Sequence, residues 1–379
     1  MTVPEKVVLI GSAYPLRGGL ATFNERLVRE YISLGSDASI VTFSLQYPSI
    51  LFPGKTQYSS EPAPEGLPIE AKLNSVNPLN WLSVGHQIAK QRPDLVIVKY
   101  WMPFMAPCLG TVCRRVRSNG HTRVVSVIDN IIPHEKRPGD RLLSSYFINS
   151  ADGFVAMSHS VMADLETFDA RKPKIWCPHP LYDNFGAAIS KDEAKKKLGL
   201  DSSSKYALFF GFIRDYKGLD LLLEAFGAEA LKNSGIKLLV AGEFYCDPAP
   251  YNEIIKKHAL EQTVIMSNDF IPDSQVVNYF CSADVIVQPY KSATQSGVTQ
   301  IAYHFDKPMI ITGVGGLAEF VPHGKVGYVV QPDPSALAAA ILEFYTTGSE
   351  AGFSANAAIE KQKYSWGRMV EAIGQMAKW

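Results

Sequence analysis

Short apolar runs alternate with amphipathic stretches along nearly the whole chain. The runs have the length of strands and are almost continuously apolar, which is typical of strands buried on both faces of a sheet. In the first half the expected strands span residues 7–11, 38–43, 94–99, 123–128, 153–157 and 174–178, and the expected helices span residues 21–34, 79–90 and 160–167. This alternation predicts an α/β protein in which helices wrap a parallel sheet.

The alternation starts again after residues 182–191, which have the composition of a linker. The second set of expected strands spans residues 206–211, 237–241, 264–266, 285–289, 308–312 and 326–330, with helices between them. A chain of 379 residues is too long for one ordinary core and suits two. We therefore expect one domain at residues 1–185, a second at 186–364, and a C-terminal helix at 365–379 that packs back on the first domain.

Two doubly wound domains joined by a linker are expected to face one another across a cleft. In open parallel sheets, ligands bind beyond the carboxyl ends of the strands, beside the point where the strand order reverses. The loops that follow the expected strands are therefore where binding residues should lie.

Composition and charge narrow the class of protein. The formal net charge is zero, which argues against a broadly basic protein that binds nucleic acid. The five cysteines are widely spaced without a Cys-x-x-Cys motif, so we expect neither a disulfide framework nor a zinc site. The sequence begins without the pattern of a signal peptide and has no apolar run of membrane-spanning length. A cytoplasmic protein is therefore predicted.

Residues 209–218 form the segment most suggestive of chemistry. An expected strand ends at Phe210, an expected helix begins at Leu219, and the turn between them carries Arg214 and Lys217. A guanidinium fork, an ammonium and the free N–H groups of a helix start together suit a phosphate. A solvated basic turn before a helix is the alternative interpretation of the same residues.

With the rest of the chain, this segment resembles the family-4 glycosyltransferases, also described as glycosyl transferases group 1, which have the GT-B fold. The resemblance extends over most of the sequence, through segments that match the Gly-rich loops and turns of that family. These segments are Gly18-Gly19, residues 209–218, residues 240–243, residues 267–271 and residues 314–319.

The resemblance implies roles for individual residues. Arg214 and Lys217 would hold the donor diphosphate as the leaving group. The remaining donor contacts would include the nucleobase, bound near residues 269–271. On this basis the expected donor-binding residues are Gly18, Gly19, Gly211, Glu243, Asp269, Phe270, Ile271, Thr294, Gln295, Ser296, Gly297, Val298 and Gln300.

The stretch at residues 291–308 departs from the family pattern. The family usually has two glutamates there, one for the donor sugar and one for the ribose, and this stretch contains none. Thr294 falls near the first position and Gln300 near the second. Ser296-Gly297 still opens an expected helix, whose N–H groups suit phosphate. Gln295 and Gln300 either hydrogen-bond sugar hydroxyls without charge or are cap and surface residues.

A second departure lies in the first domain, where the family often has His-Asp after the strand matching residues 123–128. Here Asp129 and Asn130 follow that strand, and His134 comes four residues later. The polar pair suits sugar hydroxyls, while His134 either reaches substrate or caps a turn. Tyr100 opens an apolar run at residues 100–105, which either packs on the first helix or lines an acceptor groove for a lipid-linked substrate.

A basic helix is expected next to this run. Arg114, Arg115 and Arg117 would either rest on an anionic membrane surface or form a solvated face. The prediction for the whole chain is a retaining, metal-independent glycosyltransferase without a cofactor, cytoplasmic and in peripheral contact with the membrane. It would move sugar from a nucleotide sugar to a glycan or lipid-linked glycan. The alternative is a non-catalytic sugar-nucleotide-binding partner of another transferase.

Overall fold

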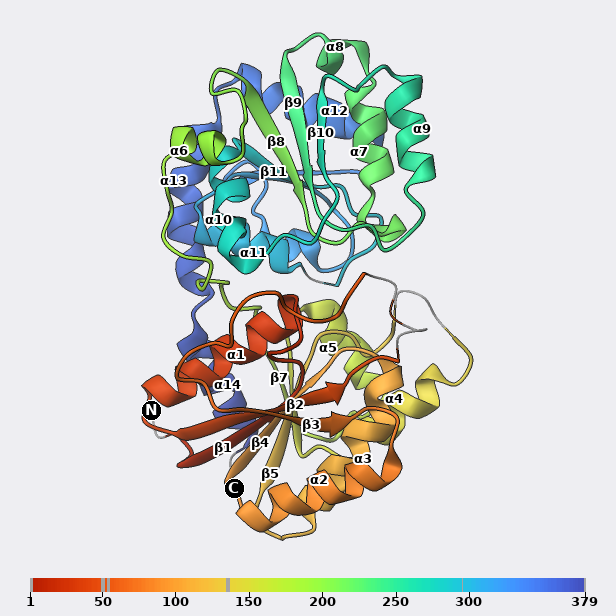
Figure 1. Ribbon diagram of the computed structural model, residues 1–379, viewed down its shortest axis with the longest axis vertical. Helices are drawn as coiled ribbons and strands as arrows, with labels where there is room; N and C mark the ends of the chain where they lie inside the picture. The colour runs from red at the N-terminus through yellow and green to blue at the C-terminus, as the bar shows by residue number, and fades with distance from the viewer. Residues whose placement is uncertain (1–2, 49–51, 53–54, 134–136, 295, 378–379) are drawn as a thin grey trace. The chain divides into compact units, whose positions relative to one another are not determined.

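The computed structural model describes residues 3–48, 52, 55–133, 137–294 and 296–377. The chain divides into two compact units (Figure 1). Unit 1 comprises Met1–Pro180 together with Tyr364–Trp379, and unit 2 comprises Leu181–Lys363. The first division falls five residues before the expected domain boundary at 185, and the C-terminal segment belongs to unit 1.

Unit 1 is built on a seven-stranded sheet in its described residues, with every neighbouring pair parallel and the order β3-β2-β1-β4-β5-β6-β7. The strands are β1 Lys6–Ile10, β2 Asp37–Leu45, β3 Ile69–Asn74, β4 Leu95–Tyr100, β5 Arg123–Ile128, β6 Gly153–Ala156 and β7 Lys174–Trp176. The chain proceeds outward from β1 in one direction and then from β4 in the other. The strand order therefore reverses between β1 and β4.

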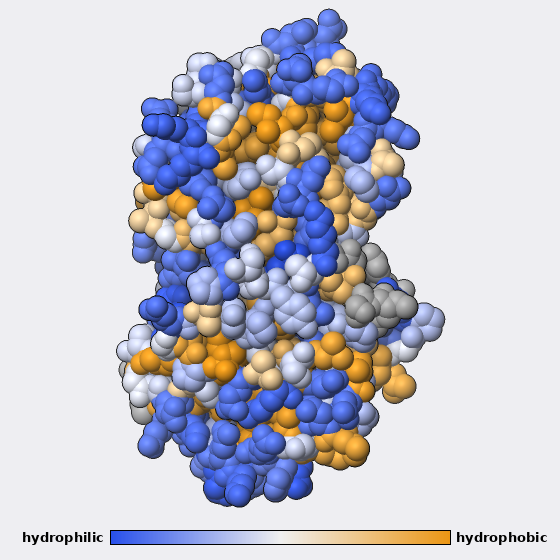
Figure 2. All heavy atoms as spheres, in the orientation of Figure 1, coloured by the Kyte–Doolittle hydropathy of each residue, from blue (hydrophilic) through white to orange (hydrophobic). Residues whose placement is uncertain are grey.

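Helices cover this sheet. They are α1 Gly19–Ser33, α2 Pro78–Gln91, the short η2 Pro103–Met105, α3 Ala106–Arg117, α4 Asp140–Ile148, α5 His159–Glu166 and α14 Trp366–Met376. The last of these lies beside α1 (Figure 1), where the rings of Trp366 and Phe23 are 5.1 Å apart. Large apolar side chains remain exposed on α2 and α4, and apolar colour shows over this side of unit 1 in Figure 2.

Unit 2 is built on a six-stranded sheet in its described residues, again with parallel pairs, in the order β10-β9-β8-β11-β12-β13. The strands are β8 Lys205–Phe210, β9 Ile236–Ala241, β10 Val264–Ser267, β11 Val285–Gln288, β12 Met309–Thr312 and β13 Gly327–Val330. The order reverses between β8 and β11, so the loops after these two strands are neighbours.

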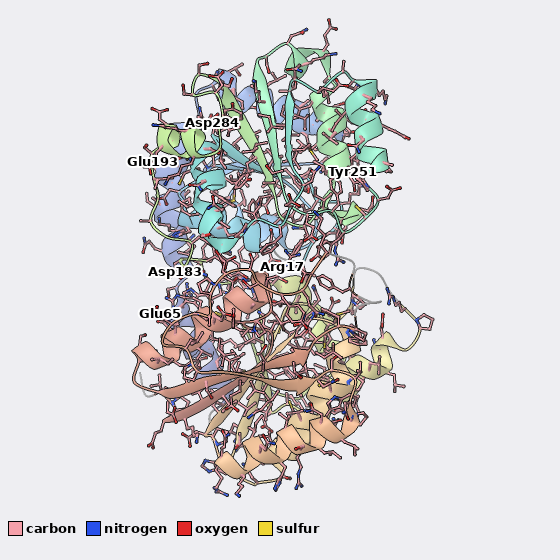
Figure 3. The ribbon with its side chains drawn as sticks, viewed as in Figure 1. Arg17, Glu65, Asp183, Glu193, Tyr251 and Asp284 are labelled. Carbon is pink, nitrogen blue, oxygen red and sulfur yellow. The ribbon has the colours of Figure 1, made fainter. Side chains whose placement is uncertain are left out.

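The helices of unit 2 surround its sheet. They are α6 Lys191–Lys197, η3 Asp215–Lys217, α7 Leu219–Phe226, α8 Glu229–Lys232, α9 Ala249–Lys257, α10 Asp273–Ser282, α11 Gly297–His304, η4 Leu317–Phe320, α12 Pro334–Thr346, α13 Glu350–Glu360 and η5 Lys361–Lys363. Asp284 directly precedes β11 and links it to the start of β8 (Figure 3). Its carboxylate pairs with Lys191 and accepts a hydrogen bond of 2.7 Å from the backbone N–H of Tyr206.

Among the strands and α-helices of the described residues, β3, α4, α8 and α13 were not expected from the sequence. Strand β3 lies at the sheet edge and carries Glu70, Lys72 and Asn74 in alternation with its apolar residues, so it has no apolar run. Helix α13 buries only Phe353 and Ala357, so its apolar residues form a weak helical pattern. Helix α4 begins at Asp140 without a side-chain cap, so the sequence gives no clear start for it. Among the described residues, no helix has both the length and the apolar character needed to cross a bilayer.

Candidate functional site

The loops after β8 and β11 meet at the switch point of unit 2. The backbone N–H of Lys291 donates to the carbonyl of Tyr216 at 2.7 Å, and the Lys291 ammonium pairs with Asp215 at 2.7 Å and Asp220 at 2.8 Å. Gly218 begins α7 with φ +67°, and a Cβ there would lie 1.9 Å from the carbonyl oxygen of Pro289. Only glycine therefore allows the two loops to approach this closely.

Lys217 is half-buried in this turn. Its ammonium donates a 2.9 Å hydrogen bond to the Tyr290 hydroxyl, which in turn lies 3.2 Å from the Ser296 hydroxyl. Burial alone would lower the pKa of Lys217, but its interactions with Tyr290 and Tyr216 raise the pKa above the ordinary value. A protonated ammonium at neutral pH is thus held just before α7.

Arg214 lies in the same turn and makes a different kind of contact. Its guanidinium carbon is 5.1 Å from the centroid of the Tyr245 ring, in the loop after β9. Within the described part of the chain, no side-chain or backbone oxygen accepts a hydrogen bond from that guanidinium. Its N–H donors therefore remain available for an anionic ligand.

Gly211 makes room for this pair of cations. Its φ is +103°, and a Cβ at this position would lie 3.4 Å from the Lys217 ammonium and 3.7 Å from Val298. A Cβ on Gly242, after the next strand, would lie 2.0 Å from the carbonyl oxygen of Gly211. The backbone at the carboxyl ends of β8 and β9 is therefore open to close approach.

The amino end of α11 borders the same turn through Ser296, Gly297 and Val298. Gln300, one turn along this helix, is 1% exposed, so the interpretation of this residue as a surface residue is wrong. Its side-chain carbonyl oxygen is buried without a hydrogen-bond partner in the described residues. The amide nitrogen of Gln288 is likewise buried and without a partner there. Neutral amides thus occupy the region in which family members carry a second glutamate.

The other predicted residues of unit 2 lie around the same edge. Glu243 follows β9 and is buried, while its carbonyl accepts the N–H of Ile213 at 2.9 Å. Asp269 is exposed after β10, and Phe270, Ile271 and Thr294 are half-buried. Gln295 lies outside the described residues.

Unit 1 carries a second polar edge at its own switch point. Helix α1 begins at Gly19, and Gly18 precedes it with φ 100°, so the amino end of this 15-residue helix lies at the Gly-Gly loop. Asp129 and Asn130 follow β5 and are half-buried. The Asp129 carboxylate pairs at 2.9 Å with Lys99, a fully buried lysine at the end of β4. His134 lies outside the described residues.

Tyr100 does not belong to this edge. It is fully buried, its ring stacks on Phe147 at 4.2 Å, and its hydroxyl is 3.0 Å from that of Ser144. The apolar run that it opens packs into the core of unit 1, where the Trp101 indole donates to Tyr47 at 2.8 Å. We therefore treat Tyr100 as a packing residue and leave it out of the proposed site.

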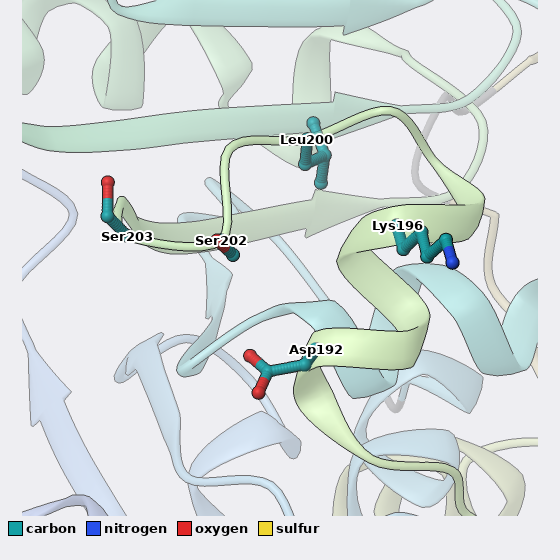
Figure 4. Close-up of a pocket in the computed structure, with 5 residues that line it drawn as sticks. All are labelled: Asp192, Lys196, Leu200, Ser202 and Ser203. Atoms are coloured by element: carbon teal, nitrogen blue, oxygen red, sulfur yellow. The ribbon is translucent and has the colours of Figure 1, made fainter.

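A hollow of about 560 Å³ lies elsewhere on unit 2, beside α6 (Figure 4). It is lined by Asp192, Lys196, Leu200, Ser202 and Ser203. The two serines directly precede β8, so this hollow lies at the amino ends of the strands. It is therefore separate from the carboxyl edge, where the candidate site residues gather.

Three residues of these edges escaped the sequence analysis: Tyr245, Tyr290 and Lys99. The only feature of the sequence that points to them is their position, because each lies at or shortly beyond the carboxyl end of an expected strand. Nothing in residue type alone separates them from core or surface residues.

Comparison with known families agrees with this architecture. A model of the family described as "Glycosyl transferase 4-like domain" matches residues 18–176, and a model of "Glycosyl transferases group 1" matches residues 204–347. The chain is 25% identical over 366 residues to the putative teichuronic acid biosynthesis glycosyltransferase TuaC of Bacillus subtilis, covering 89% of each chain. It is 24% identical over 290 residues to a D-inositol 3-phosphate glycosyltransferase of Corynebacterium urealyticum, covering 72% of this chain and 68% of the relative.

Solved structures show the same fold. Sucrose-phosphate synthase from Thermosynechococcus elongatus superposes with a TM-score of 0.77 at 17% identity, covering 98% of each chain. HepE from Anabaena, in complex with UDP and glucose, superposes with a TM-score of 0.75 at 16% identity, again covering 98% of each.

Two doubly wound parallel α/β units with a cationic, glycine-rich turn at a switch point define the chain as a glycosyltransferase of the GT-B fold. It belongs to the family-4 glycosyltransferases.

Proposed function

We propose that the enzyme transfers a sugar from a nucleoside-diphosphate donor, held by unit 2, to a glycan or lipid-linked glycan. The observation that carries this proposal is the pairing of Arg214, whose guanidinium donates to no described acceptor, with Lys217 in one turn at the β8/β11 switch point. A guanidinium fork and a fixed ammonium beside a helix start suit a diphosphate. The Anabaena neighbour was solved with UDP and glucose, which supports a donor of this class.

The same two cations would promote the reaction. As the glycosidic bond to the diphosphate breaks, negative charge grows on the leaving oxygen, where Arg214 and Lys217 stabilise it more than in the ground state. We propose that the anomeric configuration is retained, that the leaving phosphate takes the proton of the acceptor hydroxyl, and that no metal ion or cofactor is needed. Nuclear magnetic resonance of the product tests retention, and assays with and without EDTA test the metal.

Neutral side chains would take the place of the family's glutamates in binding the sugar and ribose hydroxyls of the donor. Gln300 offers a buried carbonyl oxygen without a described partner, and Ser296 lies at the free amino end of α11. A carbonyl oxygen accepts a hydrogen bond from a ribose or sugar hydroxyl, but without the strength of a carboxylate. We propose that Thr294, Gln295 and Gln300 therefore bind donor hydroxyls with less charge than in typical members of the family.

We propose that unit 1 binds the acceptor through the polar pair Asp129 and Asn130, and that its Gly18-Gly19 loop contacts the donor. A carboxylate and an amide at the carboxyl ends of strands suit sugar hydroxyls. The name of the Bacillus relative places it in teichuronic acid biosynthesis, which supports a glycan acceptor.

We further propose that unit 1 touches an anionic membrane surface. Leu79 on α2 is 78% exposed and Leu142 on α4 is 76% exposed. The basic helix α3 lies between them, since Arg115 contacts His86 on α2 and Arg114 stacks on Tyr146 of α4 at 3.8 Å. Sedimentation with phosphatidylglycerol vesicles tests this proposal. The native protein should sediment with the vesicles, and the variant in which serine replaces Leu79 and Leu142 should remain in the supernatant.

The decisive experiment compares three lysine and arginine variants. Arg214→Ala and Lys217→Ala should each lower transfer from a panel of nucleotide sugars by about a hundredfold or more. Lys291→Ala is the matched control, since that ammonium is already paired with Asp215 and Asp220. Near-native rates in both test variants would overturn the assignment. Donor binding without turnover by the native protein would instead favour the non-catalytic alternative.

A further inference from the structure

Three aromatic rings stand in a column beside Arg214. Phe270 and Phe212 lie 6.1 Å apart with their planes 28° from parallel, and Phe212 and Tyr245 lie 4.3 Å apart at 31°. The Arg214 guanidinium is 5.1 Å from the Tyr245 ring, at the end of this column. The rings come from the loops after three adjacent strands, β8, β9 and β10.

We propose that Tyr245 is a positioning residue for Arg214, which holds the guanidinium in the direction that the donor diphosphate requires. This inference rests on the proposed function, because it assumes that Arg214 binds the diphosphate. Tyr245 itself need not touch the donor.

A cation–π contact suits this task better than an ion pair would. An aromatic ring attracts the flat face of a guanidinium and leaves the five N–H donors at its edge unused. A carboxylate partner would consume two of those donors and cancel the charge. Among the described residues the guanidinium donates no hydrogen bond and lies over the Tyr245 ring, so Arg214 is oriented while its hydrogen-bonding capacity is kept.

The Tyr245 ring is itself held in place relative to Arg214. Beyond the strands, the pairing of β8 and β9 continues through an isolated bridge between Ile213 and Phe244. The N–H of Ile213 donates to the carbonyl of Glu243 at 2.9 Å, and the N–H of Tyr245 donates to the carbonyl of Ile213 at 2.9 Å. These bonds fix the backbone directly before Arg214 to the backbone that carries the ring.

The contact between Arg214 and the Tyr245 ring would strengthen ligand binding by preorganising the arginine side chain. A free arginine side chain has many rotamers, and fixing it on binding costs affinity. A ring that already restricts those rotamers reduces that cost, so its loss should weaken the binding of every ligand that Arg214 grips. The base or the sugar attached to the diphosphate should make no difference.

The experiment measures dissociation constants of UDP, GDP, ADP and inorganic diphosphate by calorimetry. Tyr245→Leu should weaken the ligands that bind the native protein by about tenfold, inorganic diphosphate included. Tyr245→Phe keeps the ring and should bind within about twofold of the native protein. In the double variant Tyr245→Leu/Arg214→Ala, binding should be no weaker than in Arg214→Ala alone, because Tyr245 acts through Arg214.

A second non-aromatic variant guards against misfolding. Tyr245→Met keeps the packing on Phe212 without offering a ring face, and thermal unfolding of each variant checks that it is folded. Native affinity in folded Leu and Met variants would overturn the proposal, and so would additive losses in the double variant. A loss confined to nucleotides, with inorganic diphosphate unaffected, would show that Tyr245 contacts the base and would also overturn it. Unchanged affinity in Arg214→Ala would instead reject the proposed function.

Discussion

The ammonium of Lys217 donates a hydrogen bond of 2.9 Å to the hydroxyl of Tyr290, across the point where the strand order of unit 2 reverses. Lys217 lies at the end of the loop after β8 and Tyr290 follows β11, so this bond is one of those that join the two loops at this switch point. The Tyr290 hydroxyl also lies 3.2 Å from that of Ser296, at the amino end of α11.

Tyr290→Phe should therefore weaken donor binding without removing a charge. The variant keeps the ring but leaves Lys217 without its hydroxyl partner, so we expect about three- to tenfold weaker binding of the preferred nucleoside diphosphate and a loss of about 1 kcal/mol in the free energy of unfolding. Calorimetry and urea denaturation measure the two effects. Tyr206→Phe is the control, since that hydroxyl bonds to the Asp201 carbonyl at the opposite end of β8 and should not affect binding. Equal losses in both variants would contradict a local role for Tyr290.

Gly218→Ala should destabilise unit 2 more than its backbone angle alone predicts. Gly218 has φ +67°, and its Cβ would lie 1.9 Å from the Pro289 carbonyl oxygen. Gly235 has a similar φ of +74° but nothing within 4 Å of its Cβ position, so Gly235→Ala reports the cost of the angle alone, about 1 kcal/mol. We expect Gly218→Ala to cost at least about 2 kcal/mol more in urea denaturation, and equal costs would show that the loops can separate freely.

The parallel sheets and most of their helices were predictable from the sequence, because buried strands of an α/β protein are nearly all apolar. Helix α7 begins at Leu219, as its pattern predicts. The edge strand β3 was not predictable, because part of it is exposed to solvent and its sequence therefore contains polar residues instead of a continuous apolar run.

The candidate site was only partly predictable. Arg214 and Lys217 carry a recognisable chemistry in a recognisable turn, and the structure places both at the switch point. Tyr245 and Tyr290 come from loops far along the chain, and only the strand order brings them to that turn. Contacts between distant loops depend on tertiary structure, which no local pattern encodes. Tyr100 shows the converse, since an aromatic residue after a strand was as consistent with the core as with a site.

The ion pair of Lys99 and Asp129 should behave as a buried charge pair. The Lys99 side chain is 2% exposed and its ammonium lies 3.4 Å from the centroid of the Phe23 ring, and burial lowers its pKa although Asp129 opposes that shift. Lys99→Met leaves the Asp129 carboxylate without this counter-ion and should cost about 3–5 kcal/mol in the free energy of unfolding.

A double variant separates the loss of charge balance from the loss of packing. Lys99→Met/Asp129→Asn carries no unpaired charge and should recover most of the lost stability in urea denaturation. If the double variant is as unstable as Lys99→Met, the packing of the lysine chain, and not the pair, is what stabilises unit 1.

Stability should fall in acid partly because of His179. Burial, and then the charge of Lys99, lower the pKa of His179 from 6.5 to about 3, while its hydrogen bond to the Pro180 carbonyl opposes the shift. Between these pH values His179 is protonated in the unfolded chain and neutral in the folded chain. Its contribution to the free energy of unfolding is therefore complete above pH 6.5 and is lost as the pH falls toward 3. The full loss amounts to about 5 kcal/mol.

His179→Asn isolates this effect, because its side-chain amide can still donate to the Pro180 carbonyl, as Nδ1 does at 2.7 Å, and cannot titrate. We expect the free energy of unfolding, followed by urea denaturation from pH 7 to pH 4, to decrease less steeply in this variant than in the native protein. If His179→Asn and the native protein lose stability in parallel, protonation of His179 does not limit folding in acid, and the carboxylates alone account for the loss.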